Sequence, residues 1–204
     1  MTARDAILKR LREAAGPAVP LPEIRRVSAG TSGLVSLFAD RAAAVGCEVM
    51  TVTAETLPGA ILGDLDRAQI HRTAIWEDRL LAPLRAALRT APFEVLDPWG
   101  HAKEEVAEAG AGITTVDFAI ALTGTLVLGS SPAHPRSTSL LPALHLAVVP
   151  VDRVVGTLSD VLARAGPLPS ALTFITGPSR TADIELTPVR GVHGPTTVKV
   201  YLLT

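Results

Sequence analysis

The residues best suited to carry chemistry lie late in the chain, and the first group is GPSRTADIE at 177–185. This segment directly follows the apolar run LTFIT, so Gly177 indicates a turn after a buried strand. Arg180 presents a planar fork of donors that suits a carboxylate or phosphate. If the segment is extended, Asp183 and Glu185 share one face and could bind a cation or exchange protons. Internal pairing of Arg180 with either carboxylate is an equally good structural alternative.

The second group is GVHGP at 191–195. Glycines on both sides of His193 favour an irregular turn, from which the imidazole could reach a ligand or a carboxylate. A structural hydrogen bond is the commoner role of a lone loop histidine. His134, His145 and His193 are too widely spaced for a metal signature, so no metal site is predicted.

A third polar stretch is the loop GSSPAHPRSTSLLP at 129–142, which leads towards a short helix. Small residues allow backbone N–H groups to face a ligand, and Arg136 adds a guanidinium beside Ser137. The alternative is a surface turn with a solvated arginine. The phosphate-binding patterns GxxxxGK[ST] and GxGxxG are both absent from the sequence.

A fourth stretch, TVDFAIALTGTLVLG at 115–129, contains Asp117 just before an apolar run that Thr123, Gly124 and Thr125 interrupt. A bulge or a tight strand crossing would explain Gly124. A backbone that approaches a ligand closely would explain it equally well.

Alternating helical and strand patterns must position these residues. Several predicted strands are continuous apolar runs, which are typical of parallel strands covered on both faces. We therefore predict a layered α/β fold with a mainly parallel sheet flanked by helices and ligand sites beyond the carboxyl ends of the strands. The predicted helices are 2–15, Ser32 to about Gly46, 56–67, 78–89, 101–109 and 153–164, and the predicted strands are 47–53, 71–76, 93–97, 116–121, 124–129, 145–150, 172–176 and 197–203.

The predicted organisation is an N-terminal helix with a Pro-rich arm at 1–22, followed by one α/β domain at 23–204. The amphipathic first helix is suited to pack as an arm or against a partner chain. A change in composition near Gly110, from charged helices to strands punctuated by Gly, Thr, Ser and Pro, indicates two lobes within the domain.

Composition excludes several classes of function. The net charge is −1 without a basic run, which argues against nucleic-acid binding. Cys47 is the only cysteine, so it cannot form an internal disulfide, an iron–sulfur cluster or a thiolate zinc site. Its apolar surroundings indicate an inert core thiol. Without a signal-peptide or bilayer-spanning pattern, the expected location is the reducing cytoplasm.

Three long segments together resemble the LUD-domain family, in its short lactate-utilisation protein C (LutC, YkgG-like) branch. They are GITTVDFAIALTGTLVL, PRSTSLLPALHLAVV and FITGPSRTADIELTPVRGVHGPTTVKVYLL, which run in order from about Gly112 to Leu203. The resemblance implies a fold similar to the NagB/RpiA/CoA-transferase group. It also implies a role in the oxidation of L-lactate to pyruvate with two iron–sulfur partner proteins.

The resemblance has two departures. Members commonly carry glutamate where this chain has Leu122, which removes a carboxylate, and the Gly-rich run before Arg136 is missing. Asp117, Asp183, Glu185 and His193 are the catalytic candidates, and no cofactor is predicted. The predicted ligand-binding residues are Thr123, Gly124, Thr125, Arg136, Ser137, Gly177, Ser179, Arg180, Thr181 and Gly194.

Three functions are compatible with these features. The first is an accessory subunit of a lactate-oxidation system, which holds a small carboxylate or other anion at Arg136 and Arg180. The second is a free-standing enzyme of the sugar-phosphate isomerase or CoA-transferase type, with Asp117, Asp183 or Glu185 as base. The third is an interaction module in which the N-terminal arm forms a homo-oligomer.

Overall fold

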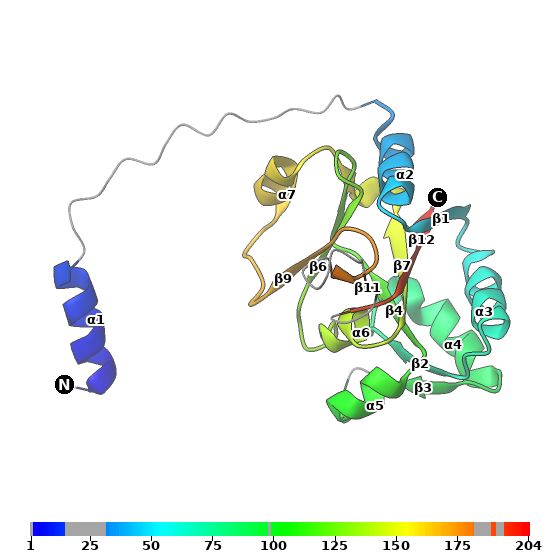
Figure 1. Cartoon of the computed structure of the whole chain (residues 1–204), viewed down its shortest axis with the longest axis horizontal. Coiled ribbons are helices and arrows are strands. Elements are labelled where there is room, and N and C mark those ends of the chain that lie inside the picture. Colours follow the sequence, from blue (N-terminus) through cyan, green and yellow to red (C-terminus); the bar gives the residue numbers. More distant parts are fainter. Residues whose placement is uncertain (1, 15–31, 98, 182–188, 191–193) are drawn as a thin grey trace.

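A computed structural model describes residues 2–14, 32–97, 99–181, 189–190 and 194–204 of the chain (Figure 1). Its centre is a six-stranded sheet in which every neighbouring pair is parallel. The strand order is β1 (Glu48–Val52), β12 (Thr197–Leu203), β7 (Leu144–Pro150), β4 (Ala111–Thr115), β2 (Arg72–Ile75) and β3 (Glu94–Leu96). The predicted layered α/β fold with a parallel sheet is confirmed.

A smaller sheet lies against the large one. Its order is β8 (Val154–Val155), β5 (Phe118–Ile120), β6 (Thr125–Gly129) and β9 (Leu172–Ile175). A short pair, β10 (Arg180–Thr181) and β11 (Val189–Arg190), is antiparallel. Strands on both sides of Gly110 belong to the large sheet, so the change in composition there does not divide the two sheets.

The helices agree with most of the predicted ranges. They are α1 (Ala3–Ala14), α2 (Leu34–Ala44), α3 (Leu57–Arg67), α4 (Ala82–Thr90), α5 (Lys103–Glu108), α6 (Ser137–Leu140) and α7 (Leu158–Arg164), with 3-10 turns η1 (Arg79–Leu81) and η2 (Val151–Arg153). None of these helices, within the part of the chain that is described, has the length and apolar character needed to cross a bilayer.

Two predicted helix starts were wrong, and one strand was not predicted. Gly33, rather than Ser32, occupies the N-cap of α2. The helix predicted at 153–164 begins only at Leu158, because β8 occupies its start and the Thr157 hydroxyl accepts a hydrogen bond from Asp160 N. Strand β4 was missed because AGITT contains glycine and two threonines and is not an apolar run.

Helix α3 lies on one face of the large sheet, and α2 and the small sheet lie on the other. Successive residues of a strand face opposite sides. In β12, Tyr201 contacts Asp64 of α3 on one side, whereas Leu202 borders a hollow with Leu34 of α2 on the other. The small sheet joins the second side, since β8 contacts α2 and the Gly124 turn lies against the α2 backbone.

A buried polar cluster fastens α3 to the sheet. The Asp64 carboxylate accepts hydrogen bonds from Tyr201 at 2.5 Å and lies 2.5 Å from Lys199 Nζ. Burial acts to raise the pKa of Asp64, but the hydrogen bonds from Lys199, Tyr201 and Arg67 outweigh it and leave this pKa below its usual value. The carboxylate therefore stays ionised and paired.

Two other titratable groups are buried in the core, as predicted for Cys47. Burial raises the pKa of the Cys47 thiol to about 11, so the thiol is neutral at pH 7. His145 in β7 is fully buried, and its Nε2 lies 2.8 Å from Thr114 Oγ1. Its Nδ1 has no hydrogen-bond partner among the described residues. Burial lowers the pKa of His145 to about 4.

We expect the free energy of unfolding to fall as the pH is lowered from about 6.5 to about 4. The folded state holds His145 neutral while the unfolded chain takes up a proton near pH 6.5, so acid favours unfolding in this window. The loss should be roughly 3 kcal/mol at most, from about 1.4 kcal/mol per pKa unit. Urea titrations at several pH values measure it.

His145→Gln should flatten this dependence whatever its effect on stability at neutral pH, because it removes the titrating group. His71→Gln is the matched control, since His71 is exposed and should leave the slope intact. Equal slopes in wild type and His145→Gln would contradict the assignment.

Candidate functional site

The predicted site residues fall into three groups in the structure. Asp183, Glu185 and His193 lie outside the described residues, and Thr181 is described only as backbone in β10. The TGT and GPSR segments lie together at one end of the small sheet. The loop after β6 lies elsewhere, beside the ends of β2 and β4.

The TGT segment forms the turn of the β5–β6 hairpin. Gly124 has φ +65° and its N–H donates to Ile120 O at 2.9 Å. A Cβ at Gly124 would overlap the backbone of Arg41 and Ala42 in α2. The structure shows a third reason for this glycine, a close approach to the backbone of a helix rather than to a crossing strand or a ligand.

The threonines beside it form a chain of hydroxyls. Thr123 Oγ1 lies 2.7 Å from Thr125 Oγ1, which in turn lies 2.8 Å from Thr176 Oγ1 at the end of β9. Each hydroxyl thus has a protein partner. The chain connects the two turns that face the end of α2.

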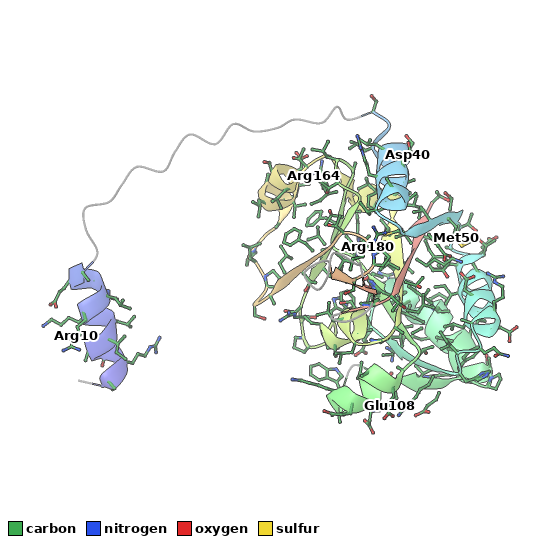
Figure 2. The ribbon with its side chains drawn as sticks, viewed as in Figure 1. Arg10, Asp40, Met50, Glu108, Arg164 and Arg180 are labelled. Atoms are coloured by element: carbon green, nitrogen blue, oxygen red, sulfur yellow. The ribbon has the colours of Figure 1, made fainter. Side chains whose placement is uncertain are left out.

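The GPSR segment closes the end of α2. Gly177 has φ +81°, and a Cβ there would overlap the carbonyl of Val45, the C-cap residue of α2. Arg180 Nη2 donates to the same Val45 carbonyl at 3.1 Å, and Figure 2 shows Arg180 near the middle of the α/β body. A cation that bonds the last carbonyls of a helix stabilises its C-terminus. These contacts give Arg180 a structural role, and its binding of an anion stays a prediction.

Ser179 and Gly194 are neighbours. Ser179 N donates to Pro195 O at 2.9 Å, and a Cβ on Gly194 would touch the Ser179 side chain at 3.4 Å. The start of GPSRTADIE and the end of GVHGP therefore lie side by side.

The loop after β6 builds a different centre. Ser131 and His134 exchange backbone hydrogen bonds, which closes a tight turn. The His134 ring stacks on Trp76 with centroids 4.3 Å apart, and Trp76 Nε1 donates to Pro135 O at 3.0 Å. The position of the His134 ring is therefore set by its stacking on Trp76, which directly follows β2.

Asp78 places a carboxylate beside this imidazole. Asp78 Oδ2 accepts a hydrogen bond from Thr115 Oγ1 at 2.7 Å and lies 3.8 Å from His134 Nε2. Trp76 and Asp78 follow β2, and Thr115 is the last residue of β4, so all three lie at the carboxyl edge of the parallel sheet. They were missed as site residues, although the rule that ligands bind at that edge could have found them.

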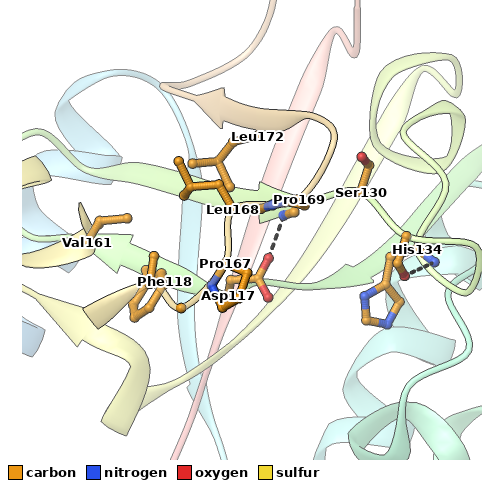
Figure 3. A pocket seen from close by; sticks show the side chains of 13 residues that line it. Asp117, Phe118, Ser130, His134, Val161, Pro167, Leu168, Pro169 and Leu172 are labelled. Carbon is orange, nitrogen blue, oxygen red and sulfur yellow. Dashed lines mark hydrogen bonds between the residues drawn. The ribbon is translucent and has the colours of Figure 1, made fainter. Parts of the chain in front are cut away.

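His134 also lines a cleft of about 290 Å³ between the small sheet and the segment after α7 (Figure 3). Its polar wall carries Asp117, whose Oδ2 accepts a hydrogen bond from Gly129 N, together with Ser130 and Ser131. The opposite wall is apolar. It is formed by Phe118, Val161, Ala165, Pro167, Leu168, Pro169 and Leu172.

Arg136 and Ser137 follow the cleft residue His134 in the sequence. Arg136 is exposed and occupies the N-cap of α6, immediately after the Pro135 carbonyl that Trp76 binds. Arg180 instead contacts Val45 at the end of α2. The two arginines are therefore attached to different parts of the fold, and neither lines the cleft.

The cleft combines acceptors, hydroxyls and a histidine with an apolar wall, which is the usual make-up of a small-molecule site. Asp117 retains Oδ1 as an acceptor for a ligand donor. Among the described residues, no cluster of three or more His, Cys, Asp or Glu side chains is arranged to hold a metal ion.

Comparisons with known proteins place this geometry in context. The LUD domain family model matches residues 35–203. Lactate utilization protein C of Halalkalibacterium halodurans is 32% identical over 79% of this chain and 75% of the relative, and that of Shouchella clausii is 31% identical over the same shares. Lactate utilization protein C of Bacillus subtilis is 40% identical over 48% of this chain and 43% of the relative.

A solved structure shares the fold. The crystal structure of a DUF162 family protein from Deinococcus radiodurans superposes with a TM-score of 0.64 at 26% identity, and the match covers 87% of this chain and 100% of that chain. The overall fold of this chain is thus similar to that of a solved structure.

Substitution of Gly124 by alanine should lower the free energy of unfolding by on the order of 3 kcal/mol. Alanine would add left-handed strain and a clash with the α2 backbone, which cannot yield as a flexible side chain would. Gly100→Ala is the matched control, because Gly100 also has positive φ but open space around it. It should cost about 1 kcal/mol. Similar losses in the two variants, measured by chemical denaturation, would contradict the role of close approach.

Proposed function

Because this chain belongs to the LUD-domain family, we propose that it takes part in lactate utilisation as an accessory, ligand-binding subunit. It acts with iron–sulfur partner proteins in the conversion of L-lactate to pyruvate. The observation that carries the proposal is the 32% identity with a lactate utilization protein C over 79% of this chain. Two further relatives of that name support it.

The cleft beside His134 is the proposed ligand site, and a small hydroxy-carboxylate is the ligand class that its groups favour. Asp117 offers an acceptor to a ligand hydroxyl, and the wall at Leu168 and Leu172 suits a short alkyl group. His134 and Ser131 can donate to a carboxylate at the other end of the cleft, which Figure 3 shows far from Phe118 and Val161.

Arg136 is proposed to contribute charge at the carboxylate end. It follows His134 by two residues and is exposed, so its guanidinium is available to an anion. Its positive charge offsets the repulsion that Asp117 would exert on a carboxylate.

Electron transfer is assigned to the partner proteins in this proposal. The single thiol, Cys47, is buried and its pKa is raised to about 11, so it offers no accessible thiolate. The chain's own contribution is then to bind and orient a small ligand or to assemble the partners.

A second function has an observation in its favour. His134 and Asp117 are acid–base groups that line one cleft, and Asp78 lies 3.8 Å from His134, as a free-standing isomerase or CoA-transferase-like enzyme would need. Turnover of a phosphosugar or an acyl-CoA by the purified chain alone, lost in His134→Gln, would favour this alternative over the accessory role.

Deletion of the gene should abolish growth on L-lactate as the only carbon source while growth on pyruvate is retained. Pyruvate lies after the proposed step, so it bypasses the defect. Growth curves with and without a wild-type copy measure the effect. Normal oxidation of lactate in the deletion strain would remove the proposal.

Asp117→Asn should lower the affinity for L-lactate relative to that for propionate about tenfold, because loss of the negative charge affects both anions alike and only lactate loses the hydroxyl contact. Propionate lacks the hydroxyl that Asp117 is proposed to accept, and a hydrogen bond to a charged group is worth about 1.5 kcal/mol or more. Ligand-observed NMR titration measures both constants. Asp66→Asn, at an exposed position on α3, is the control and should bind both acids as wild type does. An equal loss for lactate and propionate would contradict the assigned contact.

A further inference from the structure

Two apolar surfaces of this chain face solvent, and the first is a stripe on α1. Ile7 is 59% exposed and Leu11 is 62% exposed, with Leu8 between them on the same side. The structure describes all of α1, and none of its residues is buried. A helix of twelve residues is only marginally stable alone in water. The stripe therefore needs a surface to cover it.

The second surface is a groove of about 400 Å³ on the outer face of the small sheet. Its walls carry Leu122, Leu158 and Phe174, which are 42%, 48% and 45% exposed. We refer to it as the Phe174 groove. The groove is a continuation of the apolar face of the small sheet. Helix α7 covers only part of that face, since Val161 is its one buried residue.

The polar groups of the Phe174 groove need no hydrogen bonds from a bound partner. Thr123, Thr125 and Thr176 hydrogen-bond to one another at 2.7 and 2.8 Å. Because these hydroxyls already have partners, an apolar side chain can cover them without leaving a buried donor unpaired. The groove is thus suited to an aliphatic surface.

We propose that the Phe174 groove binds α1 of a second copy of the chain, so that two copies exchange their N-terminal helices around a two-fold axis. The exchange covers the stripe and the groove of both copies in one symmetric interface. The inference does not depend on the proposed function in lactate utilisation.

The attachment point of the arm supports exchange. Gly33 and Leu34, which begin α2, share a hollow with Val151 and Val154. Val154 belongs to β8, and the chain then runs through Thr157 to Leu158 in the wall of the groove. Val154 packs in the same buried cluster as Phe38 of α2, whereas Ile120 of the groove packs with Val155 and Val161 on the other face of the small sheet. The groove therefore faces away from the base of its own arm, and an arm that crosses to a facing copy covers that copy's groove instead.

The arm is also long enough. Nineteen residues separate Ala14 from Leu34 in the sequence. Fully extended, such a segment spans roughly 60 Å, which is enough to cross to a neighbouring copy. Lys9 and Glu13 would stay in water, because they pair at 3.8 Å on the side of α1 away from the stripe, and Figure 2 shows Arg10 projecting from α1.

Disulfide trapping between two differently tagged, full-length chains tests the proposal. One chain carries Leu11→Cys and the other Phe174→Cys, and they are co-expressed and then oxidised. Any disulfide between the introduced cysteines must join two copies. Cys47 is buried in both chains and should stay unreacted. The matched control replaces Leu11→Cys by Glu13→Cys, on the polar side of α1.

The expected result is a mixed-tag covalent dimer at least tenfold more abundant for Leu11→Cys than for Glu13→Cys. Wild type should be a dimer by light scattering, and Leu11→Asp should raise the dimer dissociation constant at least tenfold while Glu13→Ala does not. Because α1 has no buried residue, these changes leave the α/β core intact. A monomeric wild type, or equal trapping in the control, would overturn the proposal. So would a disulfide that forms only within a single chain carrying both Leu11→Cys and Phe174→Cys.

Discussion

The contact between the C-terminal end of α2 and two turns of the small sheet determines most of what this fold can do. At Gly124 and Gly177 the turns approach the α2 backbone so closely that a Cβ would overlap it. Protein interiors are dense and adjust poorly to added volume. The two glycines therefore fix the distance between α2 and the small sheet, and the Arg180 bond to Val45 closes the helix end there. This contact therefore sets the position of the small sheet, and with it the positions of the cleft and the groove on its outer face.

Local pattern was sufficient to predict the strands that are mainly apolar. Strand β7 is buried from His145 to Pro150, and β12 likewise places Val198 and Val200 in the core, so their composition predicts a sheet covered on both faces. Strand β4 is buried along its whole length but was not predicted, because tertiary contacts set its composition. Gly112 is required there because α6 crosses directly over it, and a Cβ would overlap the Thr138 carbonyl.

The site was predictable only in part, for the same reason. The loop after β6 was identified from its small and polar residues, and Asp117 and His134 do line a cleft together. Trp76, Asp78 and Thr115 were not identified, since the bonds that make them one network join residues 59 and 37 positions apart. Arg180 shows the converse. Its polar context suggested an anion ligand or a carboxylate partner, whereas the structure pairs it with a backbone carbonyl 135 positions away.

Helix α7 links the cleft and the Phe174 groove in space. The hydroxyl of Thr157 and the carboxylate of Asp160 form a capping box that fixes where this short helix begins. That start point directs Leu158 to the groove, while Val161, one turn later, borders the cleft and packs on Val155. Without the cap, the first-turn N–H groups would lose their partners and the register of both residues would be free to change. The capping box, a local sequence signal of a few residues, thus positions the α7 side of both the cleft and the Phe174 groove. The other side of the groove depends on the long-range contact at Gly124, and the other side of the cleft depends on the long-range contact at Trp76.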